Sequence, residues 1–120
     1  SISFAHALKL NADSFTERLF LTVRLDDEQN PVALCSISHL DRSNQIAELG
    51  CIVSPASYKR KIAHFALHAL AQQTADNLPI KEFILDIHPE NLAACRLANS
   101  LGYKKCPSRA NIYFVAIAPV

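Results

Sequence analysis

The chain has 120 residues, half of which are hydrophobic, and its 12 basic and 11 acidic side chains leave a formal net charge of +1. This length fits a single domain with one core, and so small a net charge excludes recruitment of nucleic acid or of an anionic membrane by a global field. No apolar run reaches the roughly 18 residues of a membrane span, and the first residues lack the pattern of a signal peptide. We therefore expect a cytoplasmic protein without nucleic-acid or membrane partners.

The N-terminal half of the chain predicts three consecutive strands. Residues 1–18 are ambiguous between a strand and a short helix. Segments rich in β-branched or alternating residues follow at 20–25, 32–40 and 46–54, and the polar turns "DDEQN" and "DRSNQ" separate them. Pro55 ends the third segment, because proline cannot donate a hydrogen bond to a strand ladder. We expect these strands to form an antiparallel meander.

The C-terminal half alternates helices with strands. Apolar residues recur at helical spacing over 56–76, and the nearly continuous apolar run at 81–88 is typical of a central strand. A short helix is expected at 91–101 and a last strand at 111–118. The order β-β-β-α-β-α-β predicts an α+β (mixed α/β) fold, in which the strand-helix-strand unit after the meander forms a right-handed crossover.

The short helix within 88–106 has clear boundaries. Its apolar residues recur at helical spacing over 94–101. Asn91 is a suitable N-cap, Gly102 is a suitable stop signal, and Tyr103 is placed to pack back on the helix. Many short surface helices of α/β domains have such boundaries, so they do not by themselves indicate a function.

Two segments resemble the motifs of a known family. The strand "AELGCIVSP" at 47–55 is similar to a family strand that has a Glu-Leu-Gly-like turn and then proline. The helix "NLAACRLANSLGY" at 91–103 is similar to a helix of pattern Asn-x-Ala-Ser-x-Arg-x-Leu-x-x-x-Gly-Phe. The family is the GCN5-related N-acetyltransferase (GNAT) superfamily, and the closest branch is that of the ribosomal-protein N-terminal acetyltransferases. The resemblance covers 20–118 and implies a mixed, mostly antiparallel sheet with helices on its faces.

The resemblance implies acetyl-CoA as cosubstrate and an amine of a protein or small molecule as acceptor. In such folds, strands corresponding to 46–54 and 81–88 are adjacent and parallel and diverge toward their C-terminal ends. The pantetheine arm lies in that gap, along a strand that corresponds here to Cys51, Ile52 and Val53. The pyrophosphate lies at the start of the next helix, where free N–H donors and the helix dipole favour an anion.

The expected pyrophosphate loop departs from the family pattern. The family uses Gln/Arg-x-x-Gly-x-Gly/Ala, because glycine lets the backbone approach the phosphates. This chain places Tyr58 at the Gln/Arg position, Lys61 at the first glycine and Ala63 at the permitted Gly/Ala. A glycine-rich cradle is therefore excluded.

Three consecutive cations replace it. Lys59, Arg60 and Lys61 lie at the positive end of the helix dipole, where each exposed cation is unfavourable by roughly 0.3–1 kcal/mol. Two interpretations stay open: the cations bind phosphate in place of the lost backbone contacts, or they are solvated side chains. The cofactor-binding residues that the resemblance implies are Cys51, Ile52, Val53, Lys59, Arg60, Lys61, Ile62, Ala63, Asn91 and Ala94.

Catalytic residues are less clearly marked. Acetyl transfer to an amine needs a base for the ammonium and an acid for the leaving thiolate. Glu48 is the candidate base, directly or through water, and the alternative is an exposed strand carboxylate. The family's Ser or Tyr acid corresponds here to Ala94 and Ala98, so Tyr103 is the substitute candidate, although it aligns with a packing Phe. Cys95 is close in sequence but expected to be buried.

No metal site is predicted. His64 and His68 lie one helical turn apart, but no third ligand accompanies them, so we expect surface histidines. The cysteines lie in apolar segments without Cys-x-x-Cys spacing, which favours buried free thiols in a reducing compartment. The four are Cys35, Cys51, Cys95 and Cys106.

Two hypotheses of function follow. The first is an active acyl-CoA-dependent N-acetyltransferase, and the second is a non-catalytic GNAT-like module that binds acyl-CoA or a protein partner. Family members carry another strand and one or two helices before "FLTVRL", and these help to form the acceptor site. We expect one GNAT-like domain over 1–120 that lacks N-terminal elements or belongs to a longer chain, a choice that the absence of methionine also leaves open. A homodimer or a further domain would then complete the acceptor surface.

Overall fold

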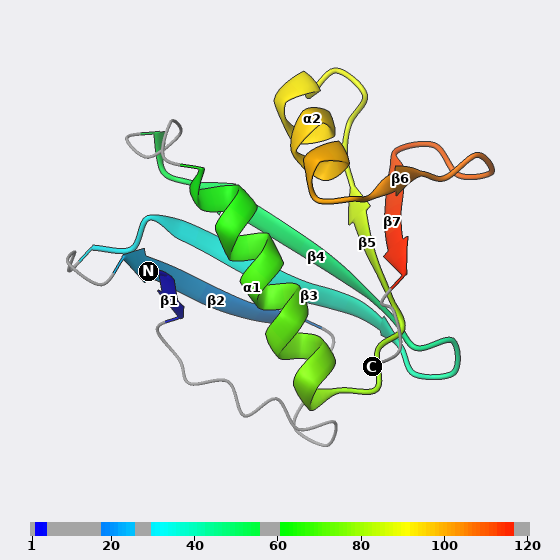
Figure 1. The fold of residues 1–120 in the computed structure, drawn as a ribbon, viewed down its shortest axis with the longest axis horizontal. Helices are drawn as coiled ribbons and strands as arrows, with labels where there is room; N and C mark the ends of the chain where they lie inside the picture. The colour runs from blue at the N-terminus through cyan, green and yellow to red at the C-terminus, as the bar shows by residue number, and fades with distance from the viewer. Residues whose placement is uncertain (1, 5–17, 26–29, 56–60, 117–120) are drawn as a thin grey trace.

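The computed structural model describes residues 2–4, 18–25, 30–55 and 61–116. They form one seven-stranded sheet, in the order β1-β2-β3-β4-β5-β7-β6, and two helices (Figure 1). The elements are β1 (Ile2–Phe4), β2 (Arg18–Leu25), β3 (Ala33–Asp41), β4 (Ile46–Val53), α1 (Ile62–Asn77), β5 (Glu82–Asp86), α2 (Leu92–Ser100), β6 (Lys104–Lys105) and β7 (Ile112–Ala116). The predicted order and the mixed α+β fold are confirmed, with the short strands β1 and β6 added.

The meander β2-β3-β4 is antiparallel, as predicted. Alternate residues of each strand are buried on one face, because the side-chain period of a strand is two. Ile37 opposes Leu49 across β3 and β4, and both are buried. The ladder is interrupted by a bulge near the end of β3, where His39 has a positive φ of 49°.

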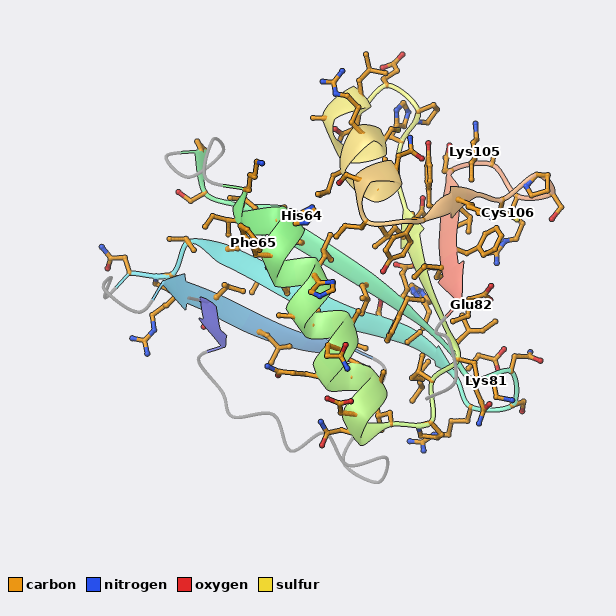
Figure 2. The ribbon with its side chains drawn as sticks, viewed as in Figure 1. His64, Phe65, Lys81, Glu82, Lys105 and Cys106 are labelled. Carbon is orange, nitrogen blue, oxygen red and sulfur yellow. The ribbon has the colours of Figure 1, made fainter. Side chains whose placement is uncertain are left out.

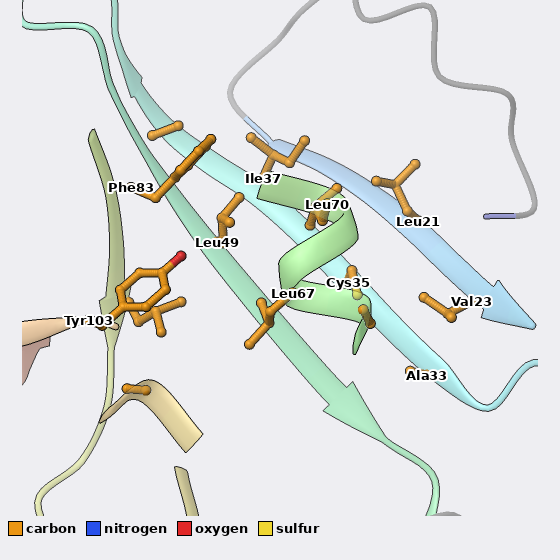
Figure 3. Packing of buried hydrophobic residues seen from close by; sticks show 14 of the residues in the cluster. Leu21, Val23, Ala33, Cys35, Ile37, Leu49, Leu67, Leu70, Phe83 and Tyr103 are labelled. Carbon is orange, nitrogen blue, oxygen red and sulfur yellow. The ribbon is translucent and has the colours of Figure 1, made fainter. Parts of the chain in front are cut away.

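Helix α1 crosses the buried face of the meander (Figure 1). Its buried residues recur with helical spacing and comprise Ile62, Ala66, Leu67, Leu70 and Thr74. The buried Thr74 hydroxyl donates to the Leu70 carbonyl at 2.7 Å, so its burial leaves no unsatisfied group. Figure 3 shows Leu67 and Leu70 of α1 over Cys35, Ile37 and Leu49 of the sheet, with Phe83 of β5 beside them. The predicted helix 56–76 thus begins at Ile62 in the described part, and 56–60 lie outside it.

Strands β4 and β5 form the one parallel pair among the described strands, as the resemblance implied. Their register joins Ile46 to Glu82, Ala47 to Phe83 and Glu48 to Ile84, and ends there although both strands continue. Beyond this point β4 runs toward the start of α1, whereas β5 runs toward α2 (Figure 1). The predicted divergence of the two strands toward their C-terminal ends is therefore confirmed.

Helix α2 has the boundaries that its sequence predicts. The Asn91 side chain caps it by accepting the Ala94 N–H at 3.1 Å. At the other end, Gly102 has a φ of +87°, and the N–H groups of Gly102 and Tyr103 donate to the carbonyls of Asn99 and Ala98. These two bonds define a Schellman motif, in which backbone N–H groups beyond the helix satisfy its last free carbonyls. Neither helix in the described ranges is long and apolar enough to cross a membrane.

Candidate functional site

In the described part of the chain, the divergence of β4 from β5 leaves one strand edge open. From Leu49 to Val53, β4 pairs with β3, while its ladder with β5 has already ended at Glu48. Backbone N–H and C=O groups on such an edge can pair with another extended, amide-containing molecule. Side chains matter little to such pairing: Ile52 is 73% exposed, whereas Cys51 and Val53 are half-buried.

The start of α1 is an uncapped helix N-terminus. Among the described residues, no side chain caps it, and its first turn contains no acidic residue. The first N–H groups of a helix lack intrahelical partners, and the helix dipole makes this end positive. Both features favour an anion. Of the three predicted cations, Lys61 is exposed, while Lys59 and Arg60 lie outside the described residues.

The backbone at Lys61 has the conformation in which glycine is favoured. Its φ of 54° and ψ of 30° are left-handed, a region that costs an ordinary L-residue roughly 1–2 kcal/mol. The family resemblance aligns Lys61 with the first glycine of the expected pyrophosphate loop. The chain thus keeps a glycine-type turn here while presenting a cation, and the turn directly precedes the free N–H groups of α1.

Ile62 and Ala63 can contact a ligand mainly through their backbone, because their side chains are wholly or partly buried. Ile62 is 3% exposed and belongs to the core, and Ala63 is half-buried.

On α2, Ala98 is fully buried and lets the helix pack closely, whereas Ala94 is half-buried. The Asn91 amide is already used as the cap, so its carbonyl oxygen is partly committed to the Ala94 N–H.

Glu48 lies at the last register position before the strands separate. Its neighbours Ala47 and Leu49 are buried toward α1, so its side chain is on the opposite face of the sheet. The carboxylate is beside β3: one oxygen is 3.5 Å from the Ser38 hydroxyl and the other 3.5 Å from His39 Nδ1. The side chain is 23% exposed. No sequence pattern indicated Ser38 and His39, because the β3–β4 register and the bulge bring them to Glu48.

Tyr103 is buried rather than presented to a ligand. The residue is 5% exposed, its hydroxyl has no hydrogen-bond partner among the described residues, and burial raises its pKa to about 12. The ring lies near Phe83 (Figure 3) and lines a cavity of about 170 Å³ between α1, β5 and β7. The other predicted site residues that the structure describes do not line this cavity.

The remaining ionisable candidates do not form a metal centre. Within the described ranges, no cluster of three or more His, Cys, Asp or Glu side chains could hold a metal ion. His68 is exposed, as expected. His64 is half-buried and joins the two helices: its Nδ1 is 3.4 Å from the Ser100 hydroxyl of α2, on the side of α1 that faces α2 (Figure 2). The cysteines are free, but only Cys35 is buried and the other three are half-buried, which corrects the expectation of four buried thiols.

The fold, the divergent strands and the uncapped helix define the class of protein. The model of the Acetyltransferase (GNAT) domain matches residues 3–104, so the chain belongs to the GNAT acetyltransferase family. A comparison with curated proteins finds no match.

Solved structures share this fold at low sequence identity. A putative ribosomal-protein-serine acetyltransferase from Vibrio cholerae is 18% identical with a TM-score of 0.73, over 84% of this chain and 65% of that one. The microcin C7 self-immunity acetyltransferase MccE, solved with acetyl-CoA and AMP, is 19% identical with a TM-score of 0.70, over 84% and 62%. A variant of the spermidine N-acetyltransferase SpeG from Vibrio cholerae is 15% identical with a TM-score of 0.75, over 87% and 67%. The chain thus spans about two thirds of the length of these relatives.

Proposed function

We propose that this protein is an N-acetyltransferase that transfers the acetyl group of acetyl-CoA to an amine of a protein or small molecule. The observation that carries the proposal is the open edge of β4 after Glu48, which leads directly toward the uncapped start of α1. The first feature suits an amide-containing arm and the second suits a phosphate group. The family membership and the acetyl-CoA complex of MccE support the same cosubstrate.

In this proposal, acetyl-CoA lies between β4–α1 and β5–α2. The pantetheine amides pair with the backbone of Cys51, Ile52 and Val53. The pyrophosphate accepts hydrogen bonds from the first N–H groups of α1, at Ile62 and Ala63, and Lys61 adds its charge. Lys59 and Arg60 are proposed to contribute further charge, and Asn91 and Ala94 to form the opposite wall.

The proposed chemistry is direct acyl transfer. The neutral amine attacks the thioester carbonyl carbon, so that a C–N bond forms and the C–S bond breaks. Glu48 removes the proton of the amine, directly or through water, from its position at the strand divergence. The leaving thiolate takes up one proton, and Tyr103 is the proposed donor. Burial raises the pKa of Tyr103 to about 12, which makes it a weaker acid than an exposed tyrosine. Its enclosed hydroxyl must therefore become accessible when the ligand binds.

The test is release of free coenzyme A thiol from acetyl-CoA in the presence of amine acceptors. The acceptors follow the named relatives: a peptide with a free N-terminal amine and the polyamine spermidine. Acetyl transfer to either amine is expected, together with its loss in Glu48→Gln. Acetyl transfer that Glu48→Gln leaves unchanged would contradict the role of Glu48 as base.

A non-catalytic acyl-CoA-binding module is the second candidate function. One observation favours it: the Tyr103 hydroxyl is enclosed and has no hydrogen-bond partner among the described residues. A homodimer or a further domain would then supply the rest of the acceptor surface. Binding of acetyl-CoA without transfer to any amine, at every protein concentration tested, would favour this candidate over the enzyme.

We also propose a cytoplasmic location. The support is chemical: four cysteines are free in the structure, and reduced thiols are typical of cytosolic proteins. Fractionation of cells that express the protein tests this location.

A further inference from the structure

Two cysteines face each other across β3 and β4. Cys35 and Cys51 are register partners in the antiparallel ladder, and their Sγ atoms are 3.5 Å apart. Cys35 belongs to the buried core on the face that α1 covers. Cys51 lies on the same face, because the two residues are directly opposite each other in the ladder. The β3–β4 pairing therefore holds the two thiols in contact.

The backbone already allows a bond between these sulfurs. Directly opposed residues of an antiparallel pair have Cα atoms about 4.5–5.5 Å apart, and disulfides bridge Cα separations of about 4.4–6.8 Å. Closing the bond thus requires rotation of two short side chains and no slip of the strands. Neither Cys95 nor Cys106 contacts another cysteine among the described hydrogen bonds.

The two thiols differ in access and in acidity. Cys35 is fully buried, whereas Cys51 is half-buried on the part of β4 that has left β5. The Cys35 thiol donates a hydrogen bond to Cys51 Sγ, which lowers the pKa of Cys51. The same contact and burial raise the pKa of Cys35. Since thiolates are the nucleophiles in thiol exchange, Cys51 is the residue that an external disulfide meets first.

We propose that Cys35 and Cys51 form a reversible dithiol–disulfide site that low-molecular-weight disulfides oxidise, with Cys51 as the attacking thiol and Cys35 as the resolving thiol. The inference is independent of acetyl transfer, because it rests on the β3–β4 register and the contact between the sulfurs.

The reaction has two balanced exchange steps. The Cys51 thiolate attacks one sulfur of the reagent, whose S–S bond breaks and releases one thiolate that takes up the proton Cys51 gave. Cys35 then loses its proton and attacks the Cys51 sulfur, which releases the second reagent thiol. Two protein thiols are oxidised by two electrons in all, and one reagent disulfide is reduced to two thiols.

The experiment uses oxidised glutathione as the probe and intact-protein mass as the readout. A Cys95→Ser/Cys106→Ser variant serves as the background, because Cys106 is a competing thiol whose pKa is lowered by its contacts with Ser108. We expect the mass of this background protein to fall by two hydrogen atoms, without an added glutathione. Reduction with dithiothreitol is expected to restore the two hydrogen atoms. Two free thiols after oxidation, or a stable glutathione adduct on the background protein, would overturn the proposal.

Matched variants separate the two roles. In the same background, Cys35→Ala is expected to accumulate one glutathione on Cys51, because nothing resolves the mixed disulfide. Cys51→Ala is expected to react at least tenfold more slowly, because the remaining thiol is buried. Equal reaction rates of the two variants would contradict the assigned order. If Cys35→Ala fails to fold, peptide mapping of the oxidised wild-type protein decides: a peptide pair joined through Cys35 and Cys51 supports the proposal, and its absence overturns it.

Discussion

At the scale of a residue, the buried hydroxyl of Tyr103 is expected to lower the stability of the protein. It is buried without a partner among the described residues, and an unsatisfied buried polar group costs roughly 1–3 kcal/mol. Tyr103→Phe, which restores the Phe of the family pattern, is therefore expected to raise the free energy of unfolding by about 1 kcal/mol. Urea unfolding measures the difference. A loss of stability of similar size would mean that the hydroxyl has a partner in the folded protein.

The same residue gives a prediction on pH. Burial raises the folded-state pKa of Tyr103 from 10.0 to about 12, so the unfolded state releases this proton first. The stabilising effect of the neutral side chain is fully present below about pH 10 and is lost as the pH rises through about 12. Unfolding free energies measured from pH 8 to pH 11 should fall more steeply for the wild type than for Tyr103→Phe. The comparison with the variant is necessary because the pKa of Tyr113 is also raised; parallel curves would contradict the prediction.

Two substitutions of Lys61 separate the effect of backbone strain on stability from the effect of charge. Its φ of 54° is unfavourable for lysine and alanine but not for glycine. Lys61→Gly is therefore expected to exceed Lys61→Ala in unfolding free energy by about 1 kcal/mol, although both lose the cation. Urea unfolding of the pair gives the strain, since the charge change is common to both. Equal stability of the two variants would show that the left-handed turn is absent in solution.

At the scale of elements, α2 has a cap whose contribution can be measured apart from any ligand contact. Asn91→Ala removes the oxygen that accepts the Ala94 N–H and is expected to cost about 1 kcal/mol of stability, whereas Asn91→Ser keeps a capping oxygen and most of that energy. If Asn91 also contacts pantetheine, Asn91→Ser weakens coenzyme A binding without a matching loss of stability. Thermal unfolding and titration of the two variants test this, and unchanged affinity in both would limit Asn91 to the cap.

Sequence patterns predicted the elements that carry a strong local signal. The meander alternates, α1 and α2 have helical periodicity, and the cap and stop of α2 are local chemistry, so Asn91 and Gly102 were identified from the sequence alone. The strand β6 is two residues long and has no pattern to detect. The parallel pairing and the divergence of β4 from β5 came from the family resemblance, since backbone pairing requires no particular side chain.

Contacts between elements were harder to predict, because they depend on register. The β3–β4 ladder shifts at a bulge between Ser38 and Asp41, and a one-residue change of register moves every side chain to the other face. The contacts of Glu48 with Ser38 and His39, and that of Cys35 with Cys51, follow from this register. The enclosure of Tyr103 also depends on contacts between elements, because α1, β5 and β7 surround the cavity that its ring lines.

At the scale of the whole molecule, the proposed binding of acetyl-CoA depends on how β4, β5 and α1 are arranged. The parallel strands separate after Glu48, the free segment of β4 leads toward the uncapped start of α1, and the family membership gives this arrangement a cosubstrate. The chain spans about two thirds of its solved relatives. The proposed binding of the cosubstrate therefore rests on the described elements, whereas the proposed acceptors follow the named relatives.

Calorimetric titration of coenzyme A into the wild-type protein and into Lys61→Glu tests whether the start of α1 binds the cosubstrate. We expect binding to the wild type and at least tenfold weaker binding to Lys61→Glu, which corresponds to about 1.4 kcal/mol. The stability of the variant should change by less than about 1 kcal/mol, because the side chain is exposed. No heat of binding to the wild type at saturating coenzyme A, or equal affinity of the two proteins, would contradict the proposed binding.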